Sequence, residues 1–215
     1  MFISDSLTGR EKVYGRTWIV LLSTCLCLSA IIAVFWHQDW QYSMPAVRPA
    51  DLQQPDMGAK LALASVGVPA EISKPIFLHF FNPDCPCSRF NIEHVRALIR
   101  RHRRSVRFIA VLQGEGGARR LAGSFRKLDL GIESIVDEHG EIARLTGVYA
   151  TPQAVLIDPN GRLYYRGNYN LTRYCTSPET EFARIALDKM LAGRPSEPVN
   201  IAASTAYGCP RPISR

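Results

Sequence analysis

Two cysteines separated by a single residue are the part of the sequence best suited to chemistry. Cys85 and Cys87 flank Pro86 and follow shortly after an apolar run, Ile76–Phe81. A thiolate is a nucleophile and a soft metal ligand, and a pair of nearby thiols can also close a redox-active disulfide. The pair therefore predicts either thiol–disulfide exchange or binding of a soft ion such as Cu(I).

Pro86 predicts where a helix begins. Proline is favoured at the first helical position and excluded from the helix interior, so the helix should start at Cys85 or Pro86. Cys85 would then face unpaired backbone N–H groups and the positive end of the helix dipole, which lower a thiol pKa. We expect Cys85 to be the exposed attacking thiol and Cys87, in the first turn, the more sheltered resolving thiol.

An uncharged N-terminal segment, residues 18–36, predicts a transmembrane helix. Its nineteen residues span about 28 Å as a helix, close to the hydrocarbon thickness of a bilayer. Arg10, Lys12 and Arg16 precede it, whereas Asp39 follows, so the positive-inside rule leaves the N-terminus in the cytoplasm and exports the rest of the chain.

Cleavage of this segment is the rival interpretation. Residues 35–38 are large or polar and make a poor signal-peptidase site, and residues 22–25 only faintly resemble a lipoprotein site, with few apolar residues before them. An uncleaved anchor fits these lengths better. Cys25 and Cys27 are then apolar filler within the span.

Cys175 and Cys209 lie near the C-terminus, in the part expected outside the cytoplasm, where disulfides persist. The simple interpretation is a structural disulfide between them that fastens the C-terminal tail to the domain. The alternative makes one of them a relay that receives the disulfide from Cys87, because connectivity does not follow from sequence.

The remaining pattern predicts one α/β domain. Composition allows a buried core, since 47% of the 215 residues are hydrophobic. The formal net charge of +7 is modest, and the six arginines of residues 96–107 are explained better by a helix C-terminus than by a nucleic-acid or phosphate site. Apolar runs predict strands at Ile76–Phe81, 106–112, 134–137, 153–158 and 163–166, and helical spacing or helix signals predict helices at 90–103, 118–128, 142–146 and 178–191.

These elements call for a mixed sheet covered by helices on both faces, with the turn at 159–161 joining the last two strands in a hairpin. The predicted organisation is a cytoplasmic tail 1–17, an anchor 18–36, a linker 37–70, a domain 71–193 and a C-terminal tail 194–215. The linker contains several prolines, with a short helix expected at 57–64.

At this point a family resemblance is visible in two motifs. An apolar strand that leads into two nearby cysteines at a helix start, Phe80-Phe81-Asn82-Pro83-Asp84-Cys85-Pro86-Cys87, resembles the active-site junction of thioredoxin-like proteins. Thr151-Pro152, after Gly147, resembles the loop where that family places a cis-proline opposite the cysteines. The similarity covers about residues 70–193 and is nearest to membrane-tethered periplasmic thioredoxins of the TlpA type.

The resemblance implies a thioredoxin-like three-layer sandwich and a thiol–disulfide oxidoreductase without an organic cofactor. Cys85 and Cys87 would be catalytic, and backbone groups at Thr151 and Pro152 would pair with an extended substrate. The implied partners are thiols or disulfides of exported proteins and a membrane or periplasmic electron donor or acceptor, with no nucleic acid. The implied location is the bacterial inner membrane, crossed once, with the C-terminal domain in the periplasm.

The motif departs from the family by being one residue shorter than Cys-x-x-Cys. Residues two apart in a helix point about 200° apart, so a Cys85–Cys87 disulfide requires local distortion. Because strain makes a disulfide easier to reduce, we expect a more oxidising centre than in a Cys-Gly-Pro-Cys thioredoxin, as suits an isomerase or oxidase.

Two other functions use the same residues. A copper-binding or metalloprotein-assembly module would hold Cu(I) between Cys85 and Cys87, with His79 or His94 as a further ligand, although both histidines are explained by packing. A peroxidase would need a Thr-x-x-Cys arrangement, which this motif lacks. Asp84 is either a proton partner of the thiols or a solvated turn residue.

Overall fold

The computed structural model describes residues 4–37, 44–69, 74–171, 177–197 and 200–210. The chain divides into two compact units, Met1–Ser43 and Met44–Arg215. The first unit contains α1 (Ser4–Phe35). Within α1, the stretch Tyr14–Phe35 has the length and apolar composition needed to cross a membrane. The helix begins well before residue 18, so much of the predicted 1–17 tail is helical rather than separate from the span.

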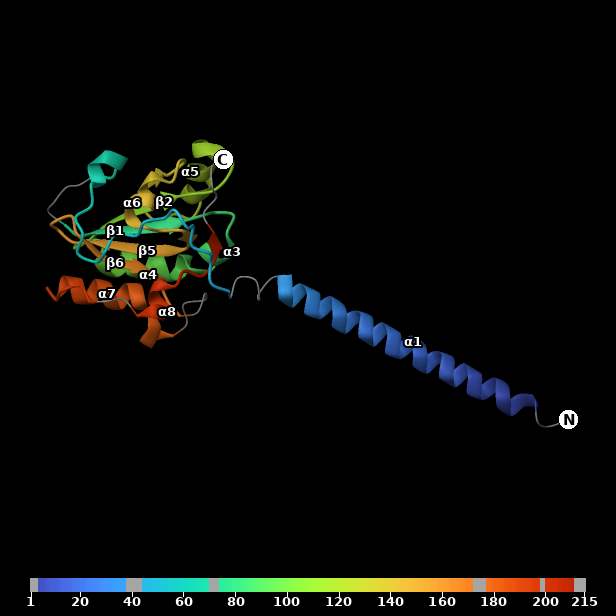
Figure 1. Ribbon diagram of the computed structural model, residues 1–215. Coiled ribbons are helices and arrows are strands. Elements are labelled where there is room, and N and C mark those ends of the chain that lie inside the picture. Colours follow the sequence, from blue (N-terminus) through green and yellow to red (C-terminus); the bar gives the residue numbers. More distant parts are fainter. Residues whose placement is uncertain (1–3, 38–43, 70–73, 172–176, 198–199, 211–215) are drawn as a thin grey trace. The chain divides into compact units, whose positions relative to one another are not determined.

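The second unit is built on a five-stranded mixed sheet with the order β3-β2-β1-β5-β6 (Figure 1). Its strands are β1 (Ile76–Phe81), β2 (Arg107–Leu112), β3 (Glu133–Val136), β5 (Gln153–Ile157) and β6 (Leu163–Gly167). The first three run parallel, whereas β5 is antiparallel to both β1 and β6. All five predicted strands and the β5–β6 hairpin are confirmed, with ends that differ by at most one residue.

Central strand β1 is buried along its whole length because both faces of the sheet are covered. Phe77 and Phe81 point into one apolar cluster, and the alternate residues Leu78 and Phe80 point into another, as the two-residue period of a strand requires. Helices α4 (Ile92–His102) and α7 (Phe182–Leu191) cover the first face, and α6 (Glu141–Thr146) covers the second (Figure 1).

The other helices lie close to where they were predicted. Helix α5 (Gly117–Arg126) matches the prediction at 118–128. The single helix predicted at 178–191 is instead a 3-10 turn, η3 (Pro178–Thr180), followed by α7, with the break at Glu181, whose ψ of 67° is not helical. Helix α4 is preceded by a separate short helix, α3 (Pro86–Phe90).

The predicted linker 37–70 is wrong from residue 44 onward. Leu61, Leu63 and Val68 are buried in the second apolar cluster, so this segment belongs to the folded domain. Its backbone runs beside the β5–β6 hairpin, where Leu61 N donates to Gly161 O at 2.9 Å. The helix expected at 57–64 is also wrong, because the segment forms only the 3-10 turn η2 (Leu63–Val66).

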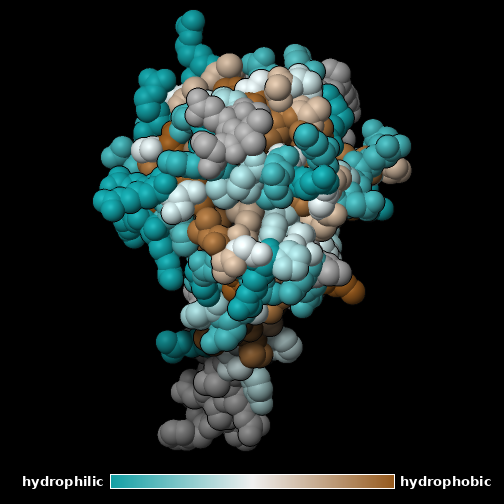
Figure 2. Space-filling model, turned by 90° about the vertical axis from the view of Figure 1, so that its left-hand side faces the viewer, coloured by the Kyte–Doolittle hydropathy of each residue, from teal (hydrophilic) through white to brown (hydrophobic). Residues whose placement is uncertain are grey.

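The predicted C-terminal tail 194–215 is likewise wrong over residues 200–210. That stretch forms α8 (Ile201–Ser204) and the short strand β7 (Cys209–Pro210). Ala203 and Ala206 are fully or almost fully buried, so their methyl groups fasten the segment to the domain. The domain surface seen in Figure 2 is mostly hydrophilic, with only scattered apolar side chains.

Candidate active site

The junction between β1 and α3 places Cys85 at the start of a helix. Cys85 is the N-cap residue, with an extended backbone (φ −84°, ψ 118°), and Pro86 occupies the first turn. Asn82 fixes the turn between strand and helix with two hydrogen bonds. Its backbone carbonyl oxygen accepts from Cys85 N at 3.1 Å, and its side-chain Oδ1 accepts from Asp84 N at 2.9 Å. The helix start predicted from Pro86 is confirmed.

The loop opposite Cys85 contains the expected cis-proline. The Thr151–Pro152 peptide bond is cis, between the two-residue strand β4 (Ala150–Thr151) and β5. The sulfur of Cys85 lies 3.4 Å from the carbonyl oxygen of Thr151. The fold therefore brings together Cys85 and Thr151, which are 66 residues apart in the chain.

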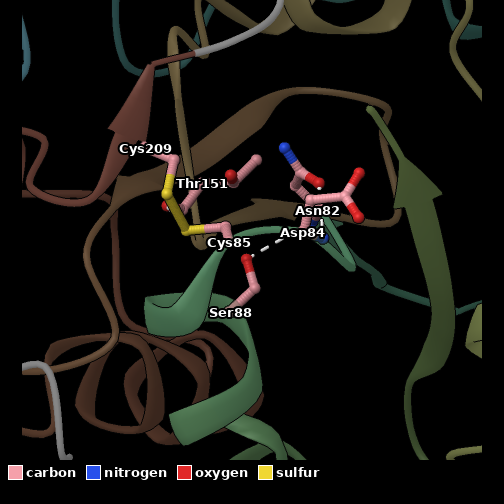
Figure 3. The surroundings of a disulfide bond; sticks show 6 residues. All are labelled: Asn82, Asp84, Cys85, Ser88, Thr151 and Cys209. Carbon is pink, nitrogen blue, oxygen red and sulfur yellow. Dashed lines mark hydrogen bonds between the residues drawn. A yellow bond between two sulfur atoms is a disulfide. The ribbon is translucent and has the colours of Figure 1, made fainter. Parts of the chain in front are cut away.

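Cys85 is joined by a disulfide to Cys209, with a Cα–Cα distance of 5.9 Å. In Figure 3 the bond runs from the turn before α3 to β7, with Thr151 beside it. The predicted structural disulfide between Cys175 and Cys209 is therefore wrong, because Cys209 has another partner. Cys175 lies outside the described residues.

The burial of the two motif cysteines corrects one expectation and agrees with another. Cys85, expected to be exposed, is only 1% accessible, since its sulfur is bonded to Cys209 beneath the C-terminal strand. Cys87 is 2% accessible, so it is sheltered as expected. Of the two bonded cysteines, Cys209 is the more accessible, being half-buried.

Strand β7 also pairs with the cis-proline loop. It runs antiparallel to β4, with Thr151 opposite Cys209 and Ala150 opposite Pro210. The backbone of Thr151 was predicted to pair with an extended substrate. In this structure an extended segment of the chain itself takes that position.

Asp84 is engaged with Arg120 rather than with the thiols. The two side chains form a bidentate ion pair. Arg120 Nη2 lies 2.5 Å from Asp84 Oδ1, and Arg120 Nη1 lies 3.0 Å from Asp84 Oδ2. The hydrogen bond from Arg120 lowers the pKa of Asp84, so the carboxylate stays ionised. About half of each side chain is exposed, which fits the solvated turn residue better than the proton partner.

The two histidines considered as metal ligands have other partners. His79 is fully buried in β1, its Nδ1 lies 2.7 Å from the Tyr169 hydroxyl, and burial lowers its pKa to about 3. His94 lies 3.8 Å from the Glu181 carboxylate, and burial lowers its pKa as well. Across the described ranges, no three His, Cys, Asp or Glu residues are grouped so that they could hold a metal ion.

Residues 56–210 match the family described as "Domain of unknown function (DUF6436)". The chain belongs to the DUF6436 family. The matched region contains both motif cysteines, the cis-proline loop and Cys209. It also begins within the segment that was predicted to be a linker, in agreement with the packing of that segment on the domain.

Solved structures share the fold of this DUF6436 chain. A hypothetical protein from Sinorhizobium meliloti 1021 is 17% identical, with a TM-score of 0.60 over 74% of this chain and 94% of that chain. An uncharacterized conserved protein from Geobacillus kaustophilus is 19% identical, with a TM-score of 0.57 over 77% and 93%. No curated protein matches the sequence.

A third structure is described as a secreted Mycobacterium tuberculosis disulfide oxidoreductase homologous to E. coli DsbE. It is 18% identical and has a TM-score of 0.42, over 56% of this chain and 82% of that chain. The thioredoxin-like fold of the DUF6436 chain rests on its own features: the mixed sheet order, the cysteines at the β1–α3 junction and the cis-proline beside them.

Sequence reasoning named Cys85, Cys87, Thr151 and Pro152 as site residues and left a relay role open for Cys209, but it did not identify Cys85 as the partner of Cys209. Strand β7 has only two residues, too few to show an alternating pattern. The sole signal was a cysteine in a segment expected outside the cytoplasm, and that signal does not select its partner.

Proposed function

We propose that this chain is a thiol–disulfide oxidoreductase in which Cys85 is the exchanging thiol and Cys87 the resolving thiol. One observation carries the proposal. Cys85, at a helix start, is bonded to a cysteine whose backbone pairs with the residue before a cis-proline. The chain thus holds an extended cysteine-containing segment as an oxidoreductase would hold a substrate in a mixed disulfide.

Two exchange steps describe the reduction of a substrate disulfide. The Cys85 thiolate attacks one substrate sulfur, and the second substrate sulfur leaves as a thiolate. Cys87, deprotonated, then attacks the Cys85 sulfur, and the substrate leaves with both sulfurs reduced while Cys85 and Cys87 become a disulfide. The reverse sequence oxidises a substrate dithiol. Neither direction needs an organic cofactor.

We further propose that the chain is anchored in the bacterial inner membrane and acts on exported proteins, with a membrane or periplasmic electron donor or acceptor. The apolar stretch Tyr14–Phe35 supports an anchor, and the arginines and lysine before residue 18 favour a cytoplasmic N-terminus. The Cys85–Cys209 disulfide supports an exported domain, because cytoplasmic thiol systems keep most disulfides reduced.

The activity is tested on the full-length protein in detergent, with insulin as the disulfide substrate. Wild-type protein should speed the reduction of insulin by dithiothreitol, and Cys85→Ser should remove the acceleration. Cys25→Ser is the matched control, because that cysteine lies in the apolar helix. Absence of acceleration in the wild type, together with tight Cu(I) binding that Cys85→Ser abolishes, would replace the proposal with metal handling.

Capture of substrate proteins requires two changes rather than one. With Cys87→Ser alone, the thiol of Cys209 could resolve the mixed disulfide in its place, since it already reaches Cys85. The pair Cys87→Ser and Cys209→Ser should accumulate mixed disulfides through Cys85 when expressed in cells. Diagonal non-reducing electrophoresis detects them, and adding Cys85→Ser should remove them.

The topology is tested with a reporter fused after Arg215. A periplasmic reporter such as alkaline phosphatase should be active, and a fluorescent protein that matures only in the cytoplasm should be dark. The opposite pair of results contradicts both the anchor orientation and the proposed location.

A further inference from the structure

The last described segment of the chain, residues 206–210, is here called the C-terminal strap. We propose that the strap is an internal substrate that fills the peptide-binding groove beside Cys85, and that Cys209 is a third redox-active cysteine of the exchange cycle. This inference rests on the proposed oxidoreductase function. It adds a catalytic thiol and a class of peptide ligand to that function.

The strap uses the backbone groups that an external peptide would need. Thr151 and Cys209 face each other in the antiparallel β4–β7 pair, directly beside the sulfur of Cys85 (Figure 3). An extended peptide that added a strand at Thr151 would occupy the same place. Strap and external peptide are therefore mutually exclusive.

Contacts other than the disulfide hold the strap in place. Ala206 is fully buried, and its N–H donates to the Tyr149 hydroxyl at 3.2 Å. The Ala206 carbonyl accepts from Ala46 N at 2.8 Å, and Tyr207 forms an antiparallel bridge with Pro45. The strap thus lies between residues 45–46 and the cis-proline loop.

Helix α8 anchors the strap from the preceding residues. Asn168 N donates to Ala203 O at 2.8 Å, and the Asn168 side chain donates to Ala202 O at 3.1 Å and to Thr205 O at 2.5 Å. These bonds do not depend on the redox state of Cys209. After reduction, Cys209 therefore stays tethered near Cys85 at an effective concentration on the order of millimolar, as expected for a short tether.

The surroundings of Gly208 indicate which residue type the groove accepts directly before the cysteine of a bound peptide. Its φ is +114°, a conformation that side chains rarely adopt, and a Cβ there would lie 2.3 Å from the Thr151 carbonyl oxygen. That oxygen belongs to the backbone, so it cannot move aside cheaply. A groove that binds other peptides as it binds the strap should prefer a Gly-Cys sequence in an extended segment.

The exchange step that releases the strap from its covalent bond to Cys85 conserves electrons. The Cys87 thiolate attacks the Cys85 sulfur, the Cys85–Cys209 bond breaks, and Cys209 leaves as a thiolate that takes up the proton lost by Cys87. One disulfide is lost and one is formed. The product carries a Cys85–Cys87 disulfide and a Cys209 thiol, and the strap is then held only by its non-covalent contacts.

The test measures access of a peptide to Cys85. The probe is the peptide Tyr-Gly-Cys-Pro with its sulfur bonded to thionitrobenzoate, whose release is followed by absorbance. The protein is the full-length chain in detergent with Cys87→Ser and Cys209→Ser, reduced beforehand. The strap can still pair with Thr151 in this protein, because serine keeps its backbone. The same protein with Cys85→Ser supplies the background rate.

Adding Gly208→Ala should expel the strap and raise the Cys85-dependent release roughly tenfold or more, since alanine there is strained and meets Thr151. Gly131→Ala is the matched control. Gly131 also has a positive φ, +64°, but a Cβ there meets nothing within 4 Å, so the release rate should not change. An unchanged rate with Gly208→Ala overturns the inference.

A second probe needs no further change to the protein. In the Gly208→Ala protein, the thionitrobenzoate form of Tyr-Gly-Cys-Pro should react several-fold faster than that of Tyr-Ala-Cys-Pro, because the added methyl group meets the Thr151 carbonyl. Equal rates mean that external peptides do not bind like the strap, which overturns the inference.

The two proposals fail differently. If release depends on Cys85 but responds neither to Gly208→Ala nor to the peptide sequence, the strap inference is wrong and the exchange chemistry of Cys85 stands. If no release depends on Cys85 in any variant, the oxidoreductase proposal fails and the strap inference falls with it.

Peptide mapping of the non-reduced wild type should find Cys85 linked to Cys209, and Gly208→Ala should shift the link to Cys85–Cys87.

Discussion

Acidification from pH 7 to pH 5 should destabilise the folded domain, and His79 should account for much of the loss. His79 lies in the middle of central strand β1, opposite Ala110 of β2 and Ala154 of β5. It is fully buried, and burial lowers its pKa to about 3 because a charged imidazole would lose its hydration. The neutral ring lies within hydrogen-bond distance of the Tyr169 hydroxyl.

The sign of the effect follows from the two pKa values. In the unfolded chain His79 titrates near its ordinary value of 6.5, so between pH 6.5 and pH 3 the unfolded state binds a proton that the folded state refuses. The stabilising contribution is complete above pH 6.5 and is lost as the pH falls. Linkage gives a loss of about 2 kcal/mol in the free energy of unfolding between pH 7 and pH 5 from this residue alone.

The assay is urea unfolding of the oxidised full-length protein in detergent at pH 7, 6 and 5, followed by the near-ultraviolet circular dichroism of the domain tyrosines. His79→Gln should be less stable than the wild type at pH 7 but should lose about 2 kcal/mol less on going to pH 5. His139→Gln is the control. His139 is exposed on the surface, so this variant controls for the loss of an imidazole outside the core.

If His79→Gln keeps the full pH dependence of the wild type, His79 is not the group that takes up the proton on unfolding. His94 and His102 add to the slope in the same direction, because burial lowers the pKa of each. The informative quantity is therefore the difference between wild type and His79→Gln. Between pH 7 and 5 most ordinary carboxylates remain ionised, so histidines dominate the measured change.

Two further predictions concern the surroundings of the site. Asn168→Ala removes the side-chain hydrogen bonds that hold α8, so dithiothreitol should reduce the Cys85–Cys209 disulfide several-fold faster. Timed alkylation followed by mass spectrometry measures the rate of reduction. An unchanged rate would show that α8 does not anchor the strap. Arg120→Ala should leave the melting temperature nearly unchanged, because the ion pair is exposed to solvent. In the same variant the pKa of Asp84 should rise toward its ordinary value in an NMR titration, because the hydrogen bond from Arg120 is lost. If the pKa of Asp84 is the same in Arg120→Ala as in the wild type, the hydrogen bond from Arg120 is not what lowers it.

Much of the fold was predictable from local pattern. Strand β1 was predicted with its observed ends, because a six-residue run with five apolar side chains, bounded by turn signals, fits a strand buried on both faces. The helix start at Cys85 followed from the stereochemistry of Pro86, and the hairpin followed from the turn at 159–161. These features depend on residues next to each other in the chain.

What lay beyond prediction depends on residues far apart. Cys85 and Cys209 are separated by 124 residues, and nothing in the spacing of the cysteines favours that pair over Cys175 and Cys209. The packing of α8 and the strap selects Cys85 as the partner. Their buried alanines and their hydrogen bonds with Tyr149 and Asn168 place Cys209 beside the cis-proline loop.

Local sequence patterns therefore indicate which residues could do the chemistry and which elements present Cys85 and Thr151. Long-range packing adds that the chain's own C-terminal strap pairs with Thr151 and is bonded to Cys85. Strand β7 has only two residues, too few for a sequence pattern to reveal it. It exists because the backbone of Thr151 offers a partner, Gly208 permits the close approach, and the docked α8 leaves Cys209 within reach of Cys85.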